Sequence, residues 1–203
     1  LPFIPDSFYY PADFFNVNTT GSVNLLWKSI QSKTVSRFVH ISTSEVYGSA
    51  QHVPMDENHP TAPHSTYAVS KLAGDRVAFT LHKENGFPVV ILRPFNTFGP
   101  RQSLRAIIPT IINQSIKNNK IKLGNLDSLR DFTFVEDTVK GFILAMKYKK
   151  CVGEVINLGT GYEFSIKETL KMILKISNKK GIIDIEKKRL RPRKSEVDRL
   201  LSN

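Results

Sequence analysis

A phenol and an ammonium group lie four residues apart, at Tyr67 and Lys71. On a helix this spacing places both side chains on one face. The positive charge of the lysine favours the phenolate, so we expect the pKa of Tyr67 to fall. A phenol with a lowered pKa can accept the proton of a substrate hydroxyl while hydride leaves the same carbon. By itself the pair also fits an ordinary surface helix, so other residues must decide.

Two polar clusters follow segments that are predicted to be short buried strands, at 37–42 and 88–94. The series Ser-Thr-Ser-Glu-Val-Tyr-Gly occupies 42–48, and Arg-Pro-Phe-Asn-Thr-Phe-Gly-Pro occupies 93–100. Open α/β sheets bind ligands at the carboxyl ends of their strands, which is where both clusters fall. The alternative is that these hydroxyls only cap the elements that follow.

The elements that must position these residues alternate between helix and strand. A helix is predicted after Pro11 and another from Ser65 to Gly86, where the glycine ends it. Together with the two strands, this order predicts an α/β fold with a parallel, doubly wound sheet. Beyond Pro100 the predicted elements are shorter and mixed, which indicates a smaller lobe. They are helices at 109–117, 136–148 and 165–177 and strands at 121–123, 132–135 and 155–158.

The net charge of +11 allows three explanations. It could be a footprint for nucleic acid, an attraction for a diphosphate, or a solvated lysine-rich surface. Much of the excess lies at 147–150, 179–180 and 187–194, without interleaved aromatic residues that could stack on bases. We therefore favour the solvated surface, with a phosphate role for one or two arginines, and expect no nucleic-acid partner.

Other classes of protein are disfavoured by composition. The longest apolar runs are too short to span a bilayer, so no membrane partner is expected. Cys151 is the single cysteine, which excludes an internal disulfide and fits a cytoplasmic location. His40, His59 and His64 lack metal-ligand spacing, and no metal site is predicted.

Taken in order and spacing, the series at 42–48, the Tyr-x-x-x-Lys pair and the series Arg-Pro-Phe-Asn-Thr-Phe-Gly-Pro-Arg resemble the extended short-chain dehydrogenase/reductase family. Its members are NAD-dependent nucleotide-sugar epimerases, dehydratases and decarboxylases. The resemblance implies NAD as cofactor, a nucleotide sugar as substrate and a homodimer at full length. It also implies a partial Rossmann-like fold. Residues 1–100 would be the C-terminal part of the dinucleotide-binding domain, and 101–203 mainly a substrate-binding lobe.

Family members begin with a strand and a turn of the form G-x-x-G-x-x-G that holds the cofactor pyrophosphate. This sequence contains no such turn and begins at Leu1. We therefore expect a fragment that starts roughly 80 residues into a family member, judged from the usual extent of a nucleotide domain. Weak binding of NAD by the fragment alone follows.

The resemblance also implies catalytic roles. Tyr67 matches the base that takes the C4 hydroxyl proton while NAD takes the hydride, and Lys71 matches its partner. Thr43 matches the residue that hydrogen-bonds the sugar O4. Glu45 matches the base at C5, unless it is a surface carboxylate. Ser44 stands where dTDP-glucose dehydratases carry an aspartate as acid, so a glutamate with a raised pKa could serve as base and then acid.

The remaining site residues implied by the resemblance are contacts to cofactor and substrate. Besides the tyrosine and the lysine, the cofactor contacts are Ser42, Pro94 and Asn96. The substrate contacts are Asn96, Arg130, Asn157 and Arg191. Arginine suits a diphosphate because its planar fork forms paired charge-assisted hydrogen bonds. For Arg191 the alternative is one more charge in a basic tail.

Segments 93–110 and 129–137 look most like dehydratases that act on UDP-N-acetylglucosamine in legionaminic-acid-type sugar pathways. We therefore predict a 4,6-dehydratase, which oxidises C4, removes water across C5 and C6 and reduces C6. Two alternatives from the same family stay open, a UDP-glucuronate decarboxylase, which shares the series at 42–48, and an epimerase. A more distant alternative is a non-catalytic basic module that binds nucleic acid.

Overall fold

The computed structural model describes residues 1–118, 120–186, 189–190 and 195–203. The larger part of the molecule is built from α1 (Ile4–Ser7), α2 (Pro11–Phe14), α3 (Gly21–Ser32), β1 (Phe38–Ile41), α4 (Thr66–Asn85), β2 (Val89–Pro94), α6 (Val135–Lys147) and β6 (Val155–Leu158). The smaller part is built from β3 (Asn96–Phe98), α5 (Ile107–Lys117), β4 (Lys120–Leu123), β5 (Leu129–Phe134), β7 (Glu163–Ser165), α7 (Ile166–Ile176), β8 (Ile182–Ile185) and β9 (Arg199–Leu200).

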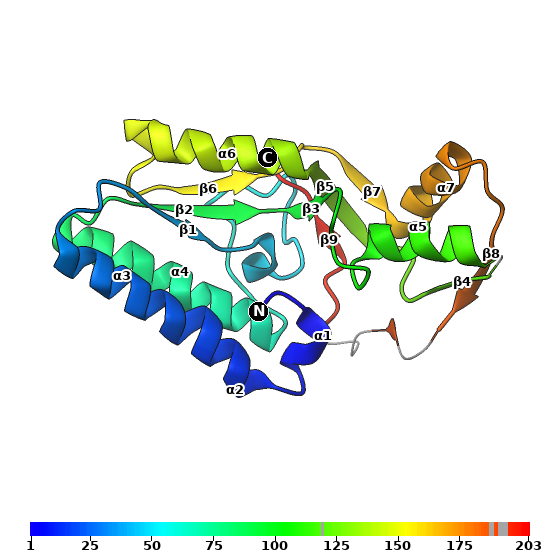
Figure 1. Cartoon of the computed structure of the whole chain (residues 1–203), viewed down its shortest axis with the longest axis horizontal. Coiled ribbons are helices and arrows are strands. Elements are labelled where there is room, and N and C mark those ends of the chain that lie inside the picture. Colours follow the sequence, from blue (N-terminus) through cyan, green and yellow to red (C-terminus); the bar gives the residue numbers. More distant parts are fainter. Residues whose placement is uncertain (119, 187–188, 191–194) are drawn as a thin grey trace.

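The larger part is a parallel sheet in the order β1-β2-β6, with helices on both faces. Helices α3 and α4 lie side by side on one face, and α6 covers the other (Figure 1). The central strand β2 is buried from Val89 to Arg93 because both of its faces are covered. Val89 and Ile91 pack toward α3 and α4, whereas Val90 and Leu92 pack toward α6. The predicted α/β fold with a parallel sheet is confirmed.

The smaller part has two short sheets with helices α5 and α7 beside them (Figure 1). In one, β5 lies between β3 and β7 and also pairs with β9. In the other, β4 and β8 run parallel. The apolar core between these elements is formed by Ile111, Ile121, Leu123 and Leu170. Within the described ranges, no helix combines the length and apolar character needed to cross a bilayer.

The helix predicted from Ser65 to Gly86 is α4. The Ser65 side chain accepts a hydrogen bond from the backbone N–H of Ala68, and Gly86 ends the helix in a left-handed conformation at φ +64°. The strand predicted at 132–135 instead begins at residue 129, and Val135 already opens α6. Both α6 and β6 return to the first sheet although they follow residue 100. The two parts therefore interleave along the chain.

Candidate active site

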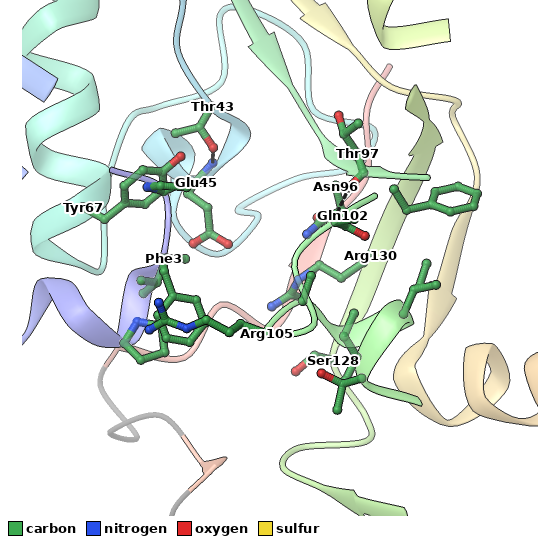
Figure 2. A pocket seen from close by; sticks show the side chains of 18 of the residues that line it. Phe3, Thr43, Glu45, Tyr67, Asn96, Thr97, Gln102, Arg105, Ser128 and Arg130 are labelled. Atoms are coloured by element: carbon green, nitrogen blue, oxygen red, sulfur yellow. Dashed lines mark hydrogen bonds between the residues drawn. The ribbon is translucent and has the colours of Figure 1, made fainter. Parts of the chain in front are cut away.

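A cavity of about 900 Å³ opens where the carboxyl ends of β1 and β2 face the smaller part. Figure 2 shows side chains from both parts turned toward it, with Thr43, Glu45 and Tyr67 on one wall and Asn96 and Arg130 on another. The predicted site residues that line it are Ser42, Thr43, Glu45, Tyr67, Lys71, Pro94, Asn96 and Arg130. The structure thus gathers most of the predicted site residues around one space.

Glu45 is carried by a short 3₁₀ helix that begins directly after β1, at Ser44–Tyr47. The Thr43 side chain caps this helix by accepting a hydrogen bond from the Glu45 backbone N–H at 3.3 Å. Gly48 ends it at φ +69°, and any Cβ there would collide with the Ala62 carbonyl. Glu45 is 8% exposed and lines the cavity, whereas Ser44 is buried and does not line it.

The Tyr67 phenol stands at the start of α4, in contact with Ile4 and Phe14. The expectation of a lowered pKa is wrong, because burial raises the pKa of Tyr67 to about 12. A hydrogen bond with Thr43 acts in the opposite direction, and the charge of Glu45 raises the pKa further. At neutral pH the side chain is therefore a neutral phenol.

Lys71 lies one turn after Tyr67, and its Nζ donates a hydrogen bond to the carbonyl oxygen of Ile41 at the end of β1. Burial lowers the pKa of Lys71, and the charge of Asp75 opposes this shift. The lysine is therefore tied to the strand that carries the first polar cluster.

A buried network that the sequence did not reveal runs beneath the cavity. Asp75 accepts hydrogen bonds from Ser42 Oγ at 3.0 Å and from Arg93 Nε at 2.9 Å. Arg93 Nη1 donates to the Tyr47 hydroxyl at 2.9 Å, and this hydroxyl donates to Asn157 Oδ1 at 2.8 Å. The network joins α4 to the ends of β1, β2 and β6. Its one sequence signal is the spacing of Asp75, a further turn beyond the Tyr-x-x-x-Lys pair.

The predicted substrate contacts differ in their positions. Arg130 is 6% exposed, lines the cavity and donates to the Val197 carbonyl at 2.7 Å. Asn96 also lines the cavity, and its Oδ1 is buried without a hydrogen-bond partner in the described part of the chain. Asn157 is not brought to the cavity, because Tyr47 and the Met55 carbonyl hold its amide.

The predicted contact Arg191 lies outside the described residues. Sequence reasoning also missed cavity residues, among them Phe3, Gln102 and Arg105. Phe3 lies in a segment to which no role was assigned. Gln102 and Arg105 follow the second polar cluster, in a segment used only to choose the subfamily.

A family model described as GDP-mannose 4,6 dehydratase matches residues 2–203, and the chain belongs to this family. It is 34% identical over 162 residues to the dTDP-glucose 4,6-dehydratase of an Actinoplanes species, which covers 79% of this chain and 50% of that protein. It is 32% identical over 171 residues to human dTDP-D-glucose 4,6-dehydratase, which covers 84% of this chain and 48% of the relative. The chain spans about half the length of these curated relatives.

Solved structures show the same fold. The dTDP-glucose 4,6-dehydratase DesIV from Streptomyces venezuelae, with NAD and TYD bound, superposes with a TM-score of 0.89 at 27% identity, over 99% of this chain and 61% of that one. The UDP-glucuronic acid 4-epimerase from Bacillus cereus, in complex with UDP-glucuronic acid and NAD, gives a TM-score of 0.83 at 32% identity, over 92% and 58%. The chain therefore has the Rossmann-like fold of dehydratases and epimerases.

Proposed function

We propose that the full-length protein is an NAD-dependent nucleotide-sugar 4,6-dehydratase. The observation that carries this proposal is the convergence of Thr43, Glu45 and Tyr67 on one cavity at the carboxyl edge of a parallel sheet. Relatives named as dTDP-glucose 4,6-dehydratases support the reaction class. Cytoplasmic location is part of the proposal and rests on the single cysteine.

The residues at the strand ends fit the nicotinamide ribose of NAD. Tyr67 and Lys71 supply a hydroxyl and an ammonium group at the cavity wall, with Ser42, Pro94 and Asn96 close by on the same edge. NAD would accept a hydride from C4 of the sugar and return a hydride to C6. The fit is supported by neighbours solved with NAD bound.

In its phenolate form, Tyr67 would take the proton of the C4 hydroxyl, with Thr43 hydrogen-bonding the same oxygen. Because burial raises the pKa of Tyr67 to about 12, the phenolate needs a positive charge nearby. Lys71, on the same face of α4, is the residue of this chain that would supply it once its Nζ turns from the carbonyl oxygen of Ile41 toward the phenol. The tyrosine and lysine would therefore act as one unit.

Glu45 would remove the C5 proton and then protonate the departing C6 hydroxyl. Both tasks fall to this carboxylate because Ser44 does not line the cavity. Glu45 is 8% exposed and lines the cavity, so its carboxylate would reach the bound sugar. Arg130 and Asn96 would face the diphosphate of the substrate.

UDP-N-acetylglucosamine is the proposed substrate, which would place the enzyme in polysaccharide biosynthesis. The support is the likeness of segments 93–110 and 129–137 to dehydratases of that type. Decarboxylation of UDP-glucuronate or epimerisation are the alternatives, and the Bacillus cereus 4-epimerase with UDP-glucuronic acid bound keeps the second in view. Product analysis would separate the three.

A homodimer is also proposed for the full-length protein. Apolar side chains stand exposed on α3 and α4, including Leu25 at 65%, Trp27 at 48% and Val69 at 40%. Helices α3 and α4 lie in contact, so these exposed apolar side chains are candidates for an interaction surface. Analytical ultracentrifugation of the full-length protein and of Leu25→Glu would test this, and a wild-type monomer would reject it.

The reaction is tested by incubating the full-length enzyme with UDP-N-acetylglucosamine and detecting a 4-keto-6-deoxy product. We expect Tyr67→Phe to lower kcat/KM about 10²- to 10⁴-fold, because the proton acceptor is lost. Tyr162→Phe is the matched control, since Tyr162 is 73% exposed and lies away from the cavity lining. No product from any UDP-, GDP- or dTDP-hexose would reject the proposal, and carbon dioxide released from UDP-glucuronate would indicate the decarboxylase.

A further inference from the structure

Arg105 joins two walls of the cavity that are far apart in sequence. Its Nη2 donates to both carboxylate oxygens of Asp6 at 2.7 Å. Its guanidinium carbon lies 3.4 Å from the centre of the Phe3 ring, which is a stacked cation–π contact. Phe3 and Arg105 both line the cavity, and Figure 2 shows them together at one side of it.

Each partner is anchored to a different part of the site. Arg105 follows a loop held by two hydrogen bonds, from Gln102 Nε2 to the Thr97 carbonyl at 2.8 Å and from Thr110 Oγ1 to the Leu104 carbonyl at 2.7 Å. Asp6 belongs to α1, whose Ile4 packs directly against Tyr67. The Asp6–Arg105 pair therefore connects the segment beside the tyrosine to the loop that leads into the smaller part.

We propose that Asp6, Arg105 and Phe3 form a clasp that closes the mouth of the cavity over the nucleotide sugar and thereby sets substrate affinity. This inference rests on the proposed function of the same cavity. The side chains of Arg105 and Asp6 are 52% and 42% exposed, so water screens the pair and it can open for ligand entry. Arg105 is a positioning residue here, because its partners are protein groups.

The charges of the pair can be exchanged to test it. In the full-length enzyme, Asp6→Arg and Arg105→Glu are each expected to raise KM and the Kd for UDP-N-acetylglucosamine about 3- to 10-fold, as for a partly exposed ion pair with a stacked ring. We expect kcat to change less than about 2-fold, since the tyrosine wall stays in place. The double variant D6R/R105E should recover most of the lost affinity.

A matched control reverses an exposed ion pair elsewhere. Lys140 and Asp137 lie 2.9 Å apart on α6, with side chains 69% and 60% exposed, outside the cavity lining. Asp137→Lys combined with Lys140→Asp should leave KM, Kd and kcat unchanged. A rise in KM with this control would show a general response to surface charge and would overturn the clasp.

Two other results would overturn it. If Asp6→Asn tightens binding while Arg105→Met weakens it, Arg105 contacts the phosphates of the ligand and Asp6 merely competes. If the double variant binds as poorly as the single variants, the two residues are not coupled through their charges.

The unfolding midpoints of wild type, Asp6→Arg, Arg105→Glu and the double variant, measured without ligand, give the coupling between the two residues independently of turnover. A zero coupling term there overturns the clasp even if no sugar nucleotide is bound. An enzyme without product but with a measurable coupling term would reject only the proposed reaction.

Discussion

Two ion pairs lie next to the cavity. The buried pair Asp75–Arg93 and its network are called the floor, and the exposed pair Asp6–Arg105 is called the mouth. Asp75 and Arg93 have side chains that are 0% and 3% exposed, at a distance of 2.9 Å. Asp6 and Arg105 are 42% and 52% exposed, at 2.7 Å. The exposed pair has the shorter distance, so distance does not decide which pair contributes more to stability. Burial and the number of shared hydrogen-bond partners decide it.

The buried pair belongs to a network of buried polar side chains, whereas the described contacts of the exposed pair add the Phe3 ring alone. Asp75 also accepts from Ser42, and Arg93 also donates to Tyr47 and stacks on its ring at 4.8 Å. Removing one partner of such a pair leaves an unpaired charge without water. Loss of a partner at the mouth leaves a charge that water can solvate. We therefore expect the buried pair to hold one arrangement and the exposed pair to break and re-form at little cost in free energy.

The largest expected effect is on stability, from Arg93→Ala. The variant leaves the Asp75 carboxylate buried, so we expect a loss of about 3–5 kcal/mol in the free energy of unfolding. Urea denaturation followed by circular dichroism measures it. Arg76→Ala is the control, because Arg76 approaches the same carboxylate at 3.5 Å with a side chain that is 51% exposed. A similar loss in both variants would show that burial does not separate them.

We expect acid to lower the free energy of unfolding by protonating His40, a buried residue whose pKa is affected by the charge of Asp75. Burial lowers the pKa of His40 to about 4, and its Nε2 has no hydrogen-bond partner in the described ranges. The charges of Lys71 and Asp75 act on it in opposite directions. Because the folded pKa lies below the unfolded value of 6.5, the unfolded chain binds the proton more readily between these values. The contribution of neutral His40 to the free energy of unfolding is complete above about pH 6.5 and falls by about 3 kcal/mol toward pH 4.

The measurement is the pH dependence of the unfolding free energy from pH 7 to pH 4 in wild type and His40→Gln. The substitution should flatten the curve in this window, whereas the same substitution at His52, an exposed residue, should not. An unchanged slope in His40→Gln would assign the acid sensitivity to other groups.

The parallel sheet and the helix that carry the buried network could be predicted from the sequence. The apolar run at 89–92 in β2 is continuous because a covered parallel sheet buries both faces of its central strand, whereas the one buried residue of β1 is His40. The shared face of Tyr67 and Lys71 follows from helical spacing alone, and both line the cavity. Short strands such as β3 and β7 have no period to detect, since each takes its conformation from pairing with β5.

The features that could not be predicted depend on contacts between segments that are far apart in sequence. The pKa of Tyr67 was predicted in the wrong direction because Phe14 and Ile4 bury the phenol, and nothing near residue 67 in sequence announces them. The amide of Asn157, a predicted substrate contact, is held by Tyr47, which is 110 residues away in sequence, and it does not line the cavity. The mouth was missed for the same reason, since Asp6 and Arg105 are 99 residues apart.

The smallest expected effect is the response of the mouth to salt. Asp6→Asn removes the charge partner of Arg105 but keeps its stacking on Phe3, so the loss in unfolding free energy should stay below about 1 kcal/mol. This loss should vanish near 1 M salt, where the Debye length is about 3 Å. Asp75→Asn, tested in parallel, should keep its larger loss, because the buried pair is screened far less. A loss in Asp6→Asn that persists at high salt would mean that the mouth is held as firmly as the floor, and the contrast between the two pairs would fail.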